Sequence, residues 1–329
     1  MLLHKPAPIT TAPLVLTEVE TPVPGPGEIL VKVSACGVCH TDLHTVEGDL
    51  PIPSIPVIPG HQVVGTVAAG GAGTSRFKMG DRVGVAWLNM TCGKCDFCVS
   101  GRENLCPDAL FTGYDRNGGY AESIIVPEQY AYAIPEGFAD LEAAPLLCAG
   151  IIGYRALRLS GAAPGWRLGL YGFGASAHVT IQVAAHLGCE VYVFSRGEEH
   201  RKLAGVLGAV WTGQVPERPG VKLDASIIFA PAGSLVPPAL EALERGGTLV
   251  LAGIHMSEVP ALDYERHLYY EKQIVSVTAS TRADGQEFLD LAASIPARTK
   301  VRTYPLDEAN AALLDLKEGR INGAAVLVP

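Results

Sequence analysis

The sequence predicts an α/β protein that combines a mostly β domain with a doubly wound parallel sheet domain. Three observations lead to this prediction. The chain has 329 residues, more than one hydrophobic core commonly organises, which indicates two domains. Residues 1–143 are rich in Pro and Gly and carry short strand-like runs. From residue 144 onward, strand-like and helix-like segments alternate with short connections.

The first domain is expected to consist of short strands joined by long loops. EILVKVSA (28–35) and QVVGTVAA (62–69) have the β-branched or alternating character of strands. Turn-forming sequences such as PGPGE and KMGDRVG separate these runs.

The second domain is expected at residues 144–280, where the alternation of elements is typical of βαβ units in a doubly wound sheet. We predict strands at 166–172, 189–195, 224–230, 246–253 and 273–280, and helices ending at 186–188, over 198–208 and around 237–244.

The C-terminal residues, 281–329, contain the helix-like segments GQEFLDLAASI and LDEANAALLDLKEG, followed by the apolar strand INGAAVLV. We expect this piece to return to the first domain. That domain would then be discontinuous and comprise residues 1–143 and 281–329.

Charge and hydropathy exclude several classes of protein. Asp and Glu number 34 against 25 Lys and Arg, and the basic residues are scattered, which argues against a nucleic-acid or anionic-membrane partner. The longest apolar stretch, 143–154, is broken by Pro145, Gly150 and Gly153, so we expect no membrane span. The N-terminal residues lack the layout of a secretion signal. We therefore expect a cytoplasmic protein.

Four of the eight cysteines follow the spacing Cys-x2-Cys-x2-Cys-x7-Cys within residues 92–106. In a reducing compartment such a cluster indicates metal ligands rather than disulfides. Four thiolates complete the tetrahedral shell of Zn²⁺ and leave no open position, which indicates a structural site. An iron–sulfur cluster and unbound core cysteines are the alternatives. The ending Cys106-Pro107 is found in ferredoxin-type clusters, but the gap of seven before it is not.

A catalytic zinc needs three protein ligands and one open position. Cys39, His61 and Cys148 are candidates from three separate segments, GVCHTDLH, IPGHQVVG and LLCAGIIG. Spacing alone leaves a second interpretation open, because a lone buried cysteine is usually a small hydrophobic residue.

The combination of GVCHTD (37–42), PGH (59–61), the four-cysteine lobe and LCAG (147–150) resembles the zinc-dependent alcohol dehydrogenases of the medium-chain dehydrogenase/reductase superfamily. The resemblance covers essentially the whole chain, in the same order. It is greatest for the yeast-like and bacterial tetrameric branch, through CHTDLH, WLN ahead of the lobe, and LCAGI. It implies a GroES-like catalytic domain with a zinc lobe and a Rossmann dinucleotide-binding domain.

The resemblance implies two Zn²⁺ ions per chain. The catalytic ion would be held by Cys39, His61 and Cys148, and the structural ion by Cys92, Cys95, Cys98 and Cys106. Cys36 is then no redox partner of Cys39, and neither Cys36 nor Cys189 is given a role.

Thr41 and His44 are three residues apart, so on a helical turn they share a face. This spacing suits a relay from the alcohol through the Thr41 hydroxyl and the cofactor ribose to His44, because a histidine side chain can take up and release a proton. The alternative is a capping threonine beside a surface histidine. Asp42 resembles the carboxylate that orients the imidazole of His61. His40 resembles the basic residue that meets the cofactor pyrophosphate, with a solvated histidine as the alternative.

The cofactor motif is the run from Gly172 to Ala177, in which Gly174 is the second glycine and Ala177 replaces the third. It follows a predicted strand and opens a helix, the context in which glycines allow a pyrophosphate to approach the helix N-terminus. At the end of the next strand, Ser195 and Arg196 stand where NAD enzymes usually carry an acidic residue. Arg196 can pair with a 2′-phosphate, so we favour NADP over NAD. Alternatively, Arg196 stacks on adenine or faces solvent while NAD binds.

The resemblance also describes a substrate pocket. Trp87 matches an aromatic wall of the alcohol site, and Leu50 stands where ethanol-preferring relatives carry tryptophan. The larger volume predicts medium-chain or aromatic primary alcohols, unless neighbouring side chains refill the space. Three residues depart from the family pattern: Gln62 replaces a glutamate beside the zinc histidine, Ile152 a threonine facing the nicotinamide, and Ala324 an arginine at the pyrophosphate.

We therefore predict a zinc-dependent alcohol dehydrogenase that interconverts primary alcohols and aldehydes with NAD(P), acting on small molecules as a homotetramer or, as second choice, a dimer. The alternatives are a polyol, threonine or cinnamyl-alcohol-type dehydrogenase of the same superfamily, and a non-catalytic sensor of zinc and nucleotide. A zinc-free quinone-type reductase would lack the ligand set.

Overall fold

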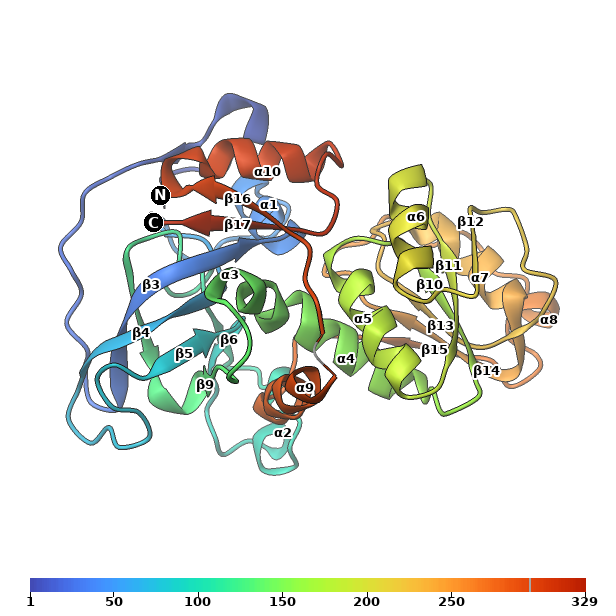
Figure 1. Ribbon diagram of the computed structural model, residues 1–329, viewed down its shortest axis with the longest axis horizontal. Coiled ribbons are helices and arrows are strands. Elements are labelled where there is room, and N and C mark those ends of the chain that lie inside the picture. The colour runs from blue at the N-terminus through green and yellow to red at the C-terminus, as the bar shows by residue number, and fades with distance from the viewer. Residues whose placement is uncertain (296) are drawn as a thin grey trace. The chain divides into compact units, whose positions relative to one another are not determined.

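The computed structural model describes residues 1–295 and 297–329, and its contacts divide the chain into two compact units (Figure 1). Unit 1 comprises Met1–Cys148, Ala279–Ala293 and Arg298–Pro329. Unit 2 comprises Ala149–Thr278 and Ser294–Ala297. This division groups Cys148 with unit 1, whereas the domain boundary predicted from the sequence lies at 143/144. That boundary, and the one predicted at 280/281, stay predictions.

The main sheet of unit 1 runs in the order β16-β17-β3-β4-β5-β9, and β8 also pairs with β3. Its strands are β3 (Glu28–Val38), β4 (Gln62–Gly70), β5 (Arg82–Val85), β8 (Ser123–Pro127), β9 (Ala131–Ala133), β16 (Val301–Pro305) and β17 (Ala324–Val328). The predicted strands 28–35 and 62–69 are confirmed as β3 and β4, each slightly longer.

Strand β3 is the centre of this sheet, because it pairs antiparallel with β4, β8 and β17. Its side chains alternate, and Ile29, Val31 and Val33 lie in the core. The register sets Gly37 of β3 opposite Gln62 of β4. The residues just beyond the end of β3 therefore lie next to those just before β4.

The C-terminal residues complete this sheet. Strand β16 leads through α10 (Ala309–Lys317) to β17, which pairs parallel with β16 and antiparallel with β3. The expected helix and apolar strand are thus present as α10 and β17. Strand β16 was not expected, because VRTYP leaves most of its side chains exposed and has no apolar alternation.

Apart from α9, the other elements of unit 1 are short. They are β1 (Leu2–Leu3), β2 (Leu14–Val15), β6 (Leu88–Met90), β7 (Leu110–Phe111), α1 (His40–Glu47), α2 (Asp96–Val99), α3 (Asp140–Ala143) and α9 (Arg282–Ser294, whose last residue groups with unit 2), with 3-10 turns η1 (Ile9–Thr11), η2 (Glu103–Leu105), η3 (Glu128–Tyr130), η4 (Ala144–Leu147) and η6 (Leu306–Glu308).

Unit 2 is built on a parallel sheet in the order β12-β11-β10-β13-β14-β15. This is the doubly wound order with its switch point between β10 and β13. The strands are β10 (Arg167–Tyr171), β11 (Glu190–Phe194), β12 (Trp211–Gly213), β13 (Leu223–Ile228), β14 (Leu243–Leu251) and β15 (Gln273–Ser276). The predicted fold class is confirmed.

The helices of unit 2 are α4 (Ala149–Ser160), α5 (Ala175–His186), α6 (Glu198–Val206), α7 (Val236–Ala242) and α8 (Tyr264–His267), with the turn η5 (Gly233–Leu235). Helix α5 packs on β11, and α4 packs on α5, β13 and β14. The approach of α4 to α5 requires Gly153, since a Cβ there would lie 2.1 Å from Oγ1 of Thr180.

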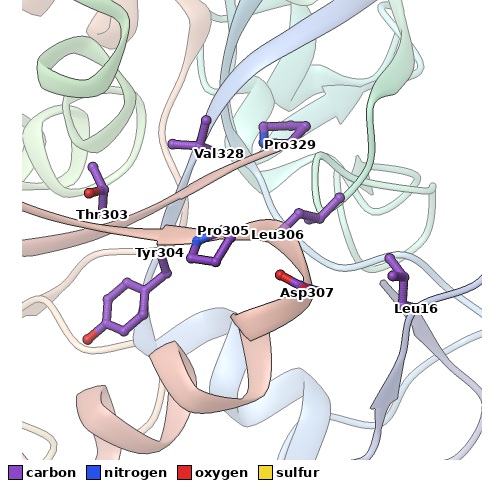
Figure 2. Close-up of a pocket in the computed structure, with 8 residues that line it drawn as sticks. All are labelled: Leu16, Thr303, Tyr304, Pro305, Leu306, Asp307, Val328 and Pro329. Atoms are coloured by element: carbon purple, nitrogen blue, oxygen red, sulfur yellow. The ribbon is translucent and has the colours of Figure 1, made fainter.

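Within the described residues, no helix has both the length and the apolar character needed to cross a bilayer. A surface hollow of about 520 Å³ lies on unit 1, beside the turn from β16 into η6 and the end of β17 (Figure 2). None of the predicted site residues lines it.

Candidate active site

Cys39 is held at the start of α1 by a reciprocal pair of hydrogen bonds. Its Sγ accepts from the Thr41 N–H at 3.3 Å, and Oδ2 of Asp42 accepts from the Cys39 N–H at 3.0 Å. This is a capping box in which a thiol takes the place of the usual hydroxyl. The cap of α1 is therefore Cys39, not Thr41, and its side chain is fixed just past the end of β3.

His61 is oriented by the same carboxylate. Oδ1 of Asp42 accepts from Nδ1 of the fully buried His61 at 2.9 Å and from the Gly60 N–H at 3.2 Å. Nε2 of His61 then faces Sγ of Cys39 at 3.4 Å. One buried carboxylate thus sets the ring orientation and joins the two segments.

Cys148 reaches the same place from the turn η4. The preceding residue, Leu147, packs against β5 at Gly84, where a Cβ would lie 2.7 Å from Leu147 Cδ2. The missing side chain of Gly84 therefore gives Leu147 the room to seat η4 on the sheet.

The donor atoms of Cys39, His61 and Cys148 all lie within 4.8 Å of one another. A thiolate sulfur and an imidazole nitrogen bound to one tetrahedral Zn²⁺ would be about 3.5 Å apart. The 3.4 Å between Cys39 and His61 fits this value. Two thiols and one imidazole are also the donors that zinc prefers, so the residues fit the metal.

The protonation of this cluster also fits a cation. Burial lowers the pKa of His61, but the charges of Asp42 and Cys39 outweigh burial and raise it to about 10. The neighbouring thiol of Cys148, together with burial, raises the pKa of Cys39. Without a metal, Cys39 and His61 therefore keep their protons. A bound divalent cation would displace these protons.

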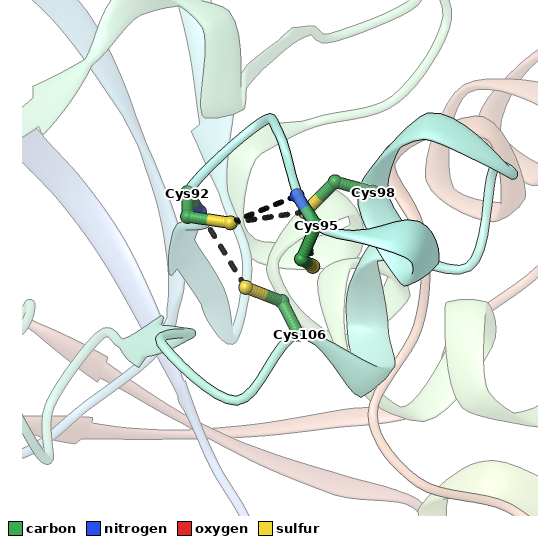
Figure 3. Close-up of side chains that lie close together, drawn as sticks. All are labelled: Cys92, Cys95, Cys98 and Cys106. Carbon is green, nitrogen blue, oxygen red and sulfur yellow. Dashed lines mark hydrogen bonds between the residues drawn. The ribbon is translucent and has the colours of Figure 1, made fainter.

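The second cluster consists of the four cysteines of the lobe, whose side chains turn toward one another (Figure 3). Sγ of Cys98 lies 3.5 Å from that of Cys95 and 4.0 Å from that of Cys92. Thiolates around one tetrahedral Zn²⁺ are about 3.8 Å apart, so a single ion fits, whereas an iron–sulfur cluster needs wider spacing. The Lys94 and Cys95 N–H groups donate to Cys92 and lower its pKa to about 6, as a metal ligand requires.

The lobe is anchored to the rest of unit 1 by buried polar contacts. Oε1 of Glu103 accepts from the backbone N–H of Arg282 at 3.0 Å and from its Nε at 2.9 Å. The guanidinium of Arg282 lies 4.7 Å from the centre of the Tyr130 ring, and the Tyr130 hydroxyl bonds to Thr91, next to Cys92. The lobe is thereby tied to the start of α9.

In unit 2 the cofactor motif forms the turn between β10 and α5. Gly172 has φ = 87°, a conformation that favours glycine. Gly174 precedes the first residue of α5, and a Cβ there would meet no atom within 4 Å. The described residues provide no side-chain cap and no acidic residue in the first turn of α5. Its N–H groups therefore offer a cradle for an anionic group, and the buried Ala177 allows α5 to pack closely.

Two family models match the chain, "Alcohol dehydrogenase GroES-like domain" over residues 25–136 and "Zinc-binding dehydrogenase" over residues 177–294. A Mycobacterium tuberculosis protein described as "Probable alcohol dehydrogenase AdhA" is 54% identical over 330 residues, covering 99% of this chain and 95% of that protein. The chain belongs to the zinc-type alcohol dehydrogenases. The predicted resemblance to the medium-chain dehydrogenase/reductase superfamily is thereby confirmed.

Solved structures similar to this alcohol dehydrogenase contain either nicotinamide cofactor. An acetophenone reductase from Geotrichum candidum in complex with NAD has a TM-score of 0.90 and 27% identity, covering 100% of this chain and 96% of that one. CAD from Helicobacter pylori complexed with NADP(H) has a TM-score of 0.86 and 27% identity, covering 92% and 91%.

The alcohol dehydrogenase has a second cation beside the predicted Ser195–Arg196 pair. Ser195 is buried at the end of β11 and Arg196 is exposed. The guanidinium of Arg201 donates to the carbonyls of both residues, at 2.7 and 2.8 Å. The sequence analysis missed Arg201. The sequence does contain a signal for this residue. Arg201 falls in the first turn of the predicted helix 198–208, directly after the strand that ends at Ser195, so its side chain can reach back to the strand end.

Aromatic side chains lie beside the cluster of Cys39, His61 and Cys148. Trp87 meets the His61 ring edge to face, with ring centres 4.9 Å apart, and stacks on Phe111 at 5.0 Å. Tyr114 lies 5.8 Å from Trp87 and donates its hydroxyl to the carbonyl of Pro51. Only Trp87 was expected, since nothing in the sequence marks Phe111 and Tyr114 as its neighbours.

The other predicted residues of the alcohol dehydrogenase lie on or after α1. Thr41 is buried and His44 is half-buried, both on this helix. His40 is exposed, with its ring centre 6.3 Å from that of His44. Leu50 follows in the turn after the helix, where its N–H lies 3.4 Å from the carbonyl of His44.

The three departures from the family pattern occupy different environments. Gln62 is buried, and its amide nitrogen has no hydrogen-bond partner in the described part of the chain. Ile152 is half-buried in α4, and Ala324 is buried in β17. None of them supplies a donor atom to either group of candidate metal ligands.

Proposed function

We propose that this alcohol dehydrogenase interconverts primary alcohols and aldehydes at the cluster of Cys39, His61 and Cys148. The observation that carries the proposal is the convergence of three donor atoms within 4.8 Å of one another. One of them belongs to the His61 imidazole, which Asp42 orients. Oxidation removes a hydride from the alcohol carbon and a proton from its hydroxyl. When bound, a nicotinamide cofactor supplies the hydride acceptor.

Cys39, His61 and Cys148 would hold the catalytic zinc. Three protein ligands leave one position open, as in other catalytic zinc sites. When bound, zinc supplies a Lewis acid that eases loss of the hydroxyl proton. Asp42 keeps Nδ1 of His61 protonated, so that Nε2 presents its lone pair to the metal.

Thr41 and His44 would carry the hydroxyl proton toward solvent. Their burial supports this, because Thr41 is buried and His44, one helical turn further on, is partly exposed. A histidine can accept and release a proton near neutral pH, which suits the outer end of the relay.

The cofactor would lie with its pyrophosphate on the turn formed by Gly172, Gly174 and Ala177, with His40 as a further contact on the family resemblance. We favour NADP. The exposed Arg196 and the guanidinium of Arg201 at the end of β11 support this preference, because both are cations. The two carboxylates of the first turn of α6, Glu198 and Glu199, pair with Lys202. The similar structures bind either cofactor, so the preference depends on these residues.

The substrate would be a medium-chain or aromatic primary alcohol. The ring of Trp87 beside His61, extended by Phe111 and Tyr114, offers an apolar wall. Leu50 would leave the pocket wider than tryptophan would. The aromatic wall also suits a cinnamyl-alcohol-type substrate, whereas polyols and threonine would find fewer polar partners there.

A second zinc would be structural, held by Cys92, Cys95, Cys98 and Cys106 within residues 92–106. We further propose a cytoplasmic homotetramer, with a dimer as second choice. The edge position of β15 and the exposed apolar side chains near it support association: Tyr264 is 66%, Tyr269 58% and Ile274 36% exposed.

The test is steady-state kinetics with NAD and NADP across ethanol, hexanol, benzyl alcohol, sorbitol and threonine, with zinc counted per chain. We expect about two zinc ions, NADP as the better cofactor, and the highest kcat/KM for hexanol or benzyl alcohol. Sorbitol or threonine as the best substrate would contradict the substrate class. Absence of turnover in the zinc-replete protein would favour a non-catalytic sensor.

A further inference from the structure

His44 is held by a carboxylate that the sequence analysis did not single out. Its Nδ1 lies 2.8 Å from Oδ2 of Asp49. The side chain of His44 is 12% exposed and that of Asp49 is 45% exposed. Because the Asp49 carboxylate is largely exposed, this contact contributes little to stability, so its effect is to be sought in the chemistry of the imidazole.

The end of α1 determines this pairing. Helix α1 stops at Glu47 because Gly48 takes the left-handed conformation, with φ = 84°. The N–H groups of Gly48 and Asp49 both donate to the carbonyl of His44, each at 3.0 Å. The chain therefore wraps around the last turn of the helix, and this returns the Asp49 side chain to the His44 ring.

A carboxylate at neutral pH can only accept hydrogen bonds, so it selects the imidazole tautomer that carries its proton on Nδ1. In that tautomer Nε2 holds the lone pair and can accept a proton. The opposite tautomer has no lone pair on Nε2. The same chain uses this device at His61, where Asp42 bonds to Nδ1 and leaves Nε2 to face Cys39.

We propose that Asp49 is a positioning residue for proton transfer, which fixes the ring orientation of His44 and its Nδ1–H tautomer. This inference rests on the proposed relay through Thr41 and His44. Two other ionisable groups of α1 differ in kind. His40 is a second imidazole, and Glu47 binds Lys317 at 2.7 Å and accepts from the Ile9 N–H at 2.9 Å.

The first test is the ¹⁵N NMR spectrum of the metal-replete enzyme with labelled histidine, at a pH where the ring is neutral. The signals of His44 are identified by their loss in His44→Gln. We expect the wild-type ring to be protonated on Nδ1 and the Asp49→Ala ring to shift toward Nε2–H. The control Glu47→Gln removes a carboxylate from the same helix end and should leave the tautomer unchanged. A wild-type ring protonated on Nε2, or an unchanged tautomer in Asp49→Ala, would overturn the proposal.

The second test separates this inference from the relay on which it rests. Asp49→Ala should lower kcat about tenfold with a smaller change in KM, and Asp49→Glu should recover part of the loss. Glu47→Gln should behave as wild type. A normal kcat in Asp49→Ala alongside a large loss in His44→Gln would overturn the role of Asp49 alone. A normal kcat in His44→Gln would overturn the relay itself, and with it any catalytic purpose for Asp49.

Discussion

The Asp42 carboxylate accepts a hydrogen bond from Nδ1 of His61 at 2.9 Å, and both side chains are buried. The second carboxylate oxygen binds the backbone of Cys39, so two proposed zinc ligands depend on one residue. We predict that Asp42→Ala weakens metal binding at this cluster about 10- to 100-fold. Chelator competition measures this, with Glu47→Gln as the control on the same helix. Equal resistance to chelator in wild type and Asp42→Ala would refute the prediction.

The two cysteine clusters should respond differently to the loss of a ligand. Cys98→Ser should remove one zinc per chain and lower the thermal unfolding temperature, because α2 and η2 are single helical turns too short to hold the shape of the lobe by themselves. Cys148→Ser should also remove one zinc and abolish turnover, with a smaller change in unfolding temperature, since η4 stays packed on Gly84. Zinc analysis and thermal unfolding of both variants provide the comparison. A larger fall in unfolding temperature for Cys148→Ser than for Cys98→Ser would contradict the assignment of the structural site to the lobe.

Cofactor preference should depend on the cations at the end of β11. We predict that Arg196→Asp lowers kcat/KM for NADP by at least about tenfold, because a charged hydrogen bond to a 2′-phosphate is replaced by repulsion. The same variant should use NAD as well as or better than wild type. Lys202→Gln is the matched control, since Lys202 is an exposed cation of α6 already paired with Glu198 and Glu199. Loss of NADP activity in the control as well would indicate a general charge effect.

Pocket width should depend on residue 50. Leu50→Trp should lower kcat/KM for benzyl alcohol about tenfold and leave that for ethanol nearly unchanged or improved, because an indole takes up the space that the larger substrate needs. Kinetics on both alcohols at saturating cofactor measure the ratio. Unchanged kcat/KM for both substrates would mean that Leu50 lies outside the pocket, and a parallel fall for both would indicate a general disturbance of the site.

The ion pair between Arg167 of β10 and Asp224 of β13 makes a pH-dependent contribution to stability. Burial raises the pKa of Asp224, but hydrogen bonds from Arg167 outweigh burial and lower it below the ordinary 3.8. A carboxylate with a lowered pKa stabilises the folded state above its ordinary pKa, and this stabilisation is lost as the pH falls through the folded value. Asp224→Asn should therefore cost about 1 kcal/mol near neutral pH and progressively less in acid. Urea unfolding across this range tests the trend, and a cost that grows in acid would contradict it.

The fold class and the longest strands could be predicted because their side chains repeat locally. Strand β3 has buried residues in alternation, whereas β16 has no such pattern and was missed. The proposed metal ligands were identified by their motifs, but spacing could not place His61 beside Cys39, 22 residues away. Their meeting depends on the pairing of Gly37 with Gln62 between β3 and β4, which is a long-range property of the sheet.

The residues that escaped prediction act through turns or neighbours rather than motifs. Arg201 reaches Ser195 only because α6 starts directly after the strand end, and Asp49 reaches His44 only because Gly48 reverses the chain. Tyr114 and Phe111 join Trp87 through tertiary packing. Such contacts depend on local backbone geometry, which composition and periodicity do not specify.

The position of β17 between β16 and β3 has a consequence for synthesis on the ribosome. Residues 39, 61 and 148 emerge early, whereas β16 and β17 follow only after the whole of unit 2 has been made. During that interval β3 lacks its β17 partner and exposes an unpaired edge beside the thiols of Cys36 and Cys39. The nascent chain would therefore be most vulnerable to aggregation and oxidation then, and early capture of a metal ion would protect it.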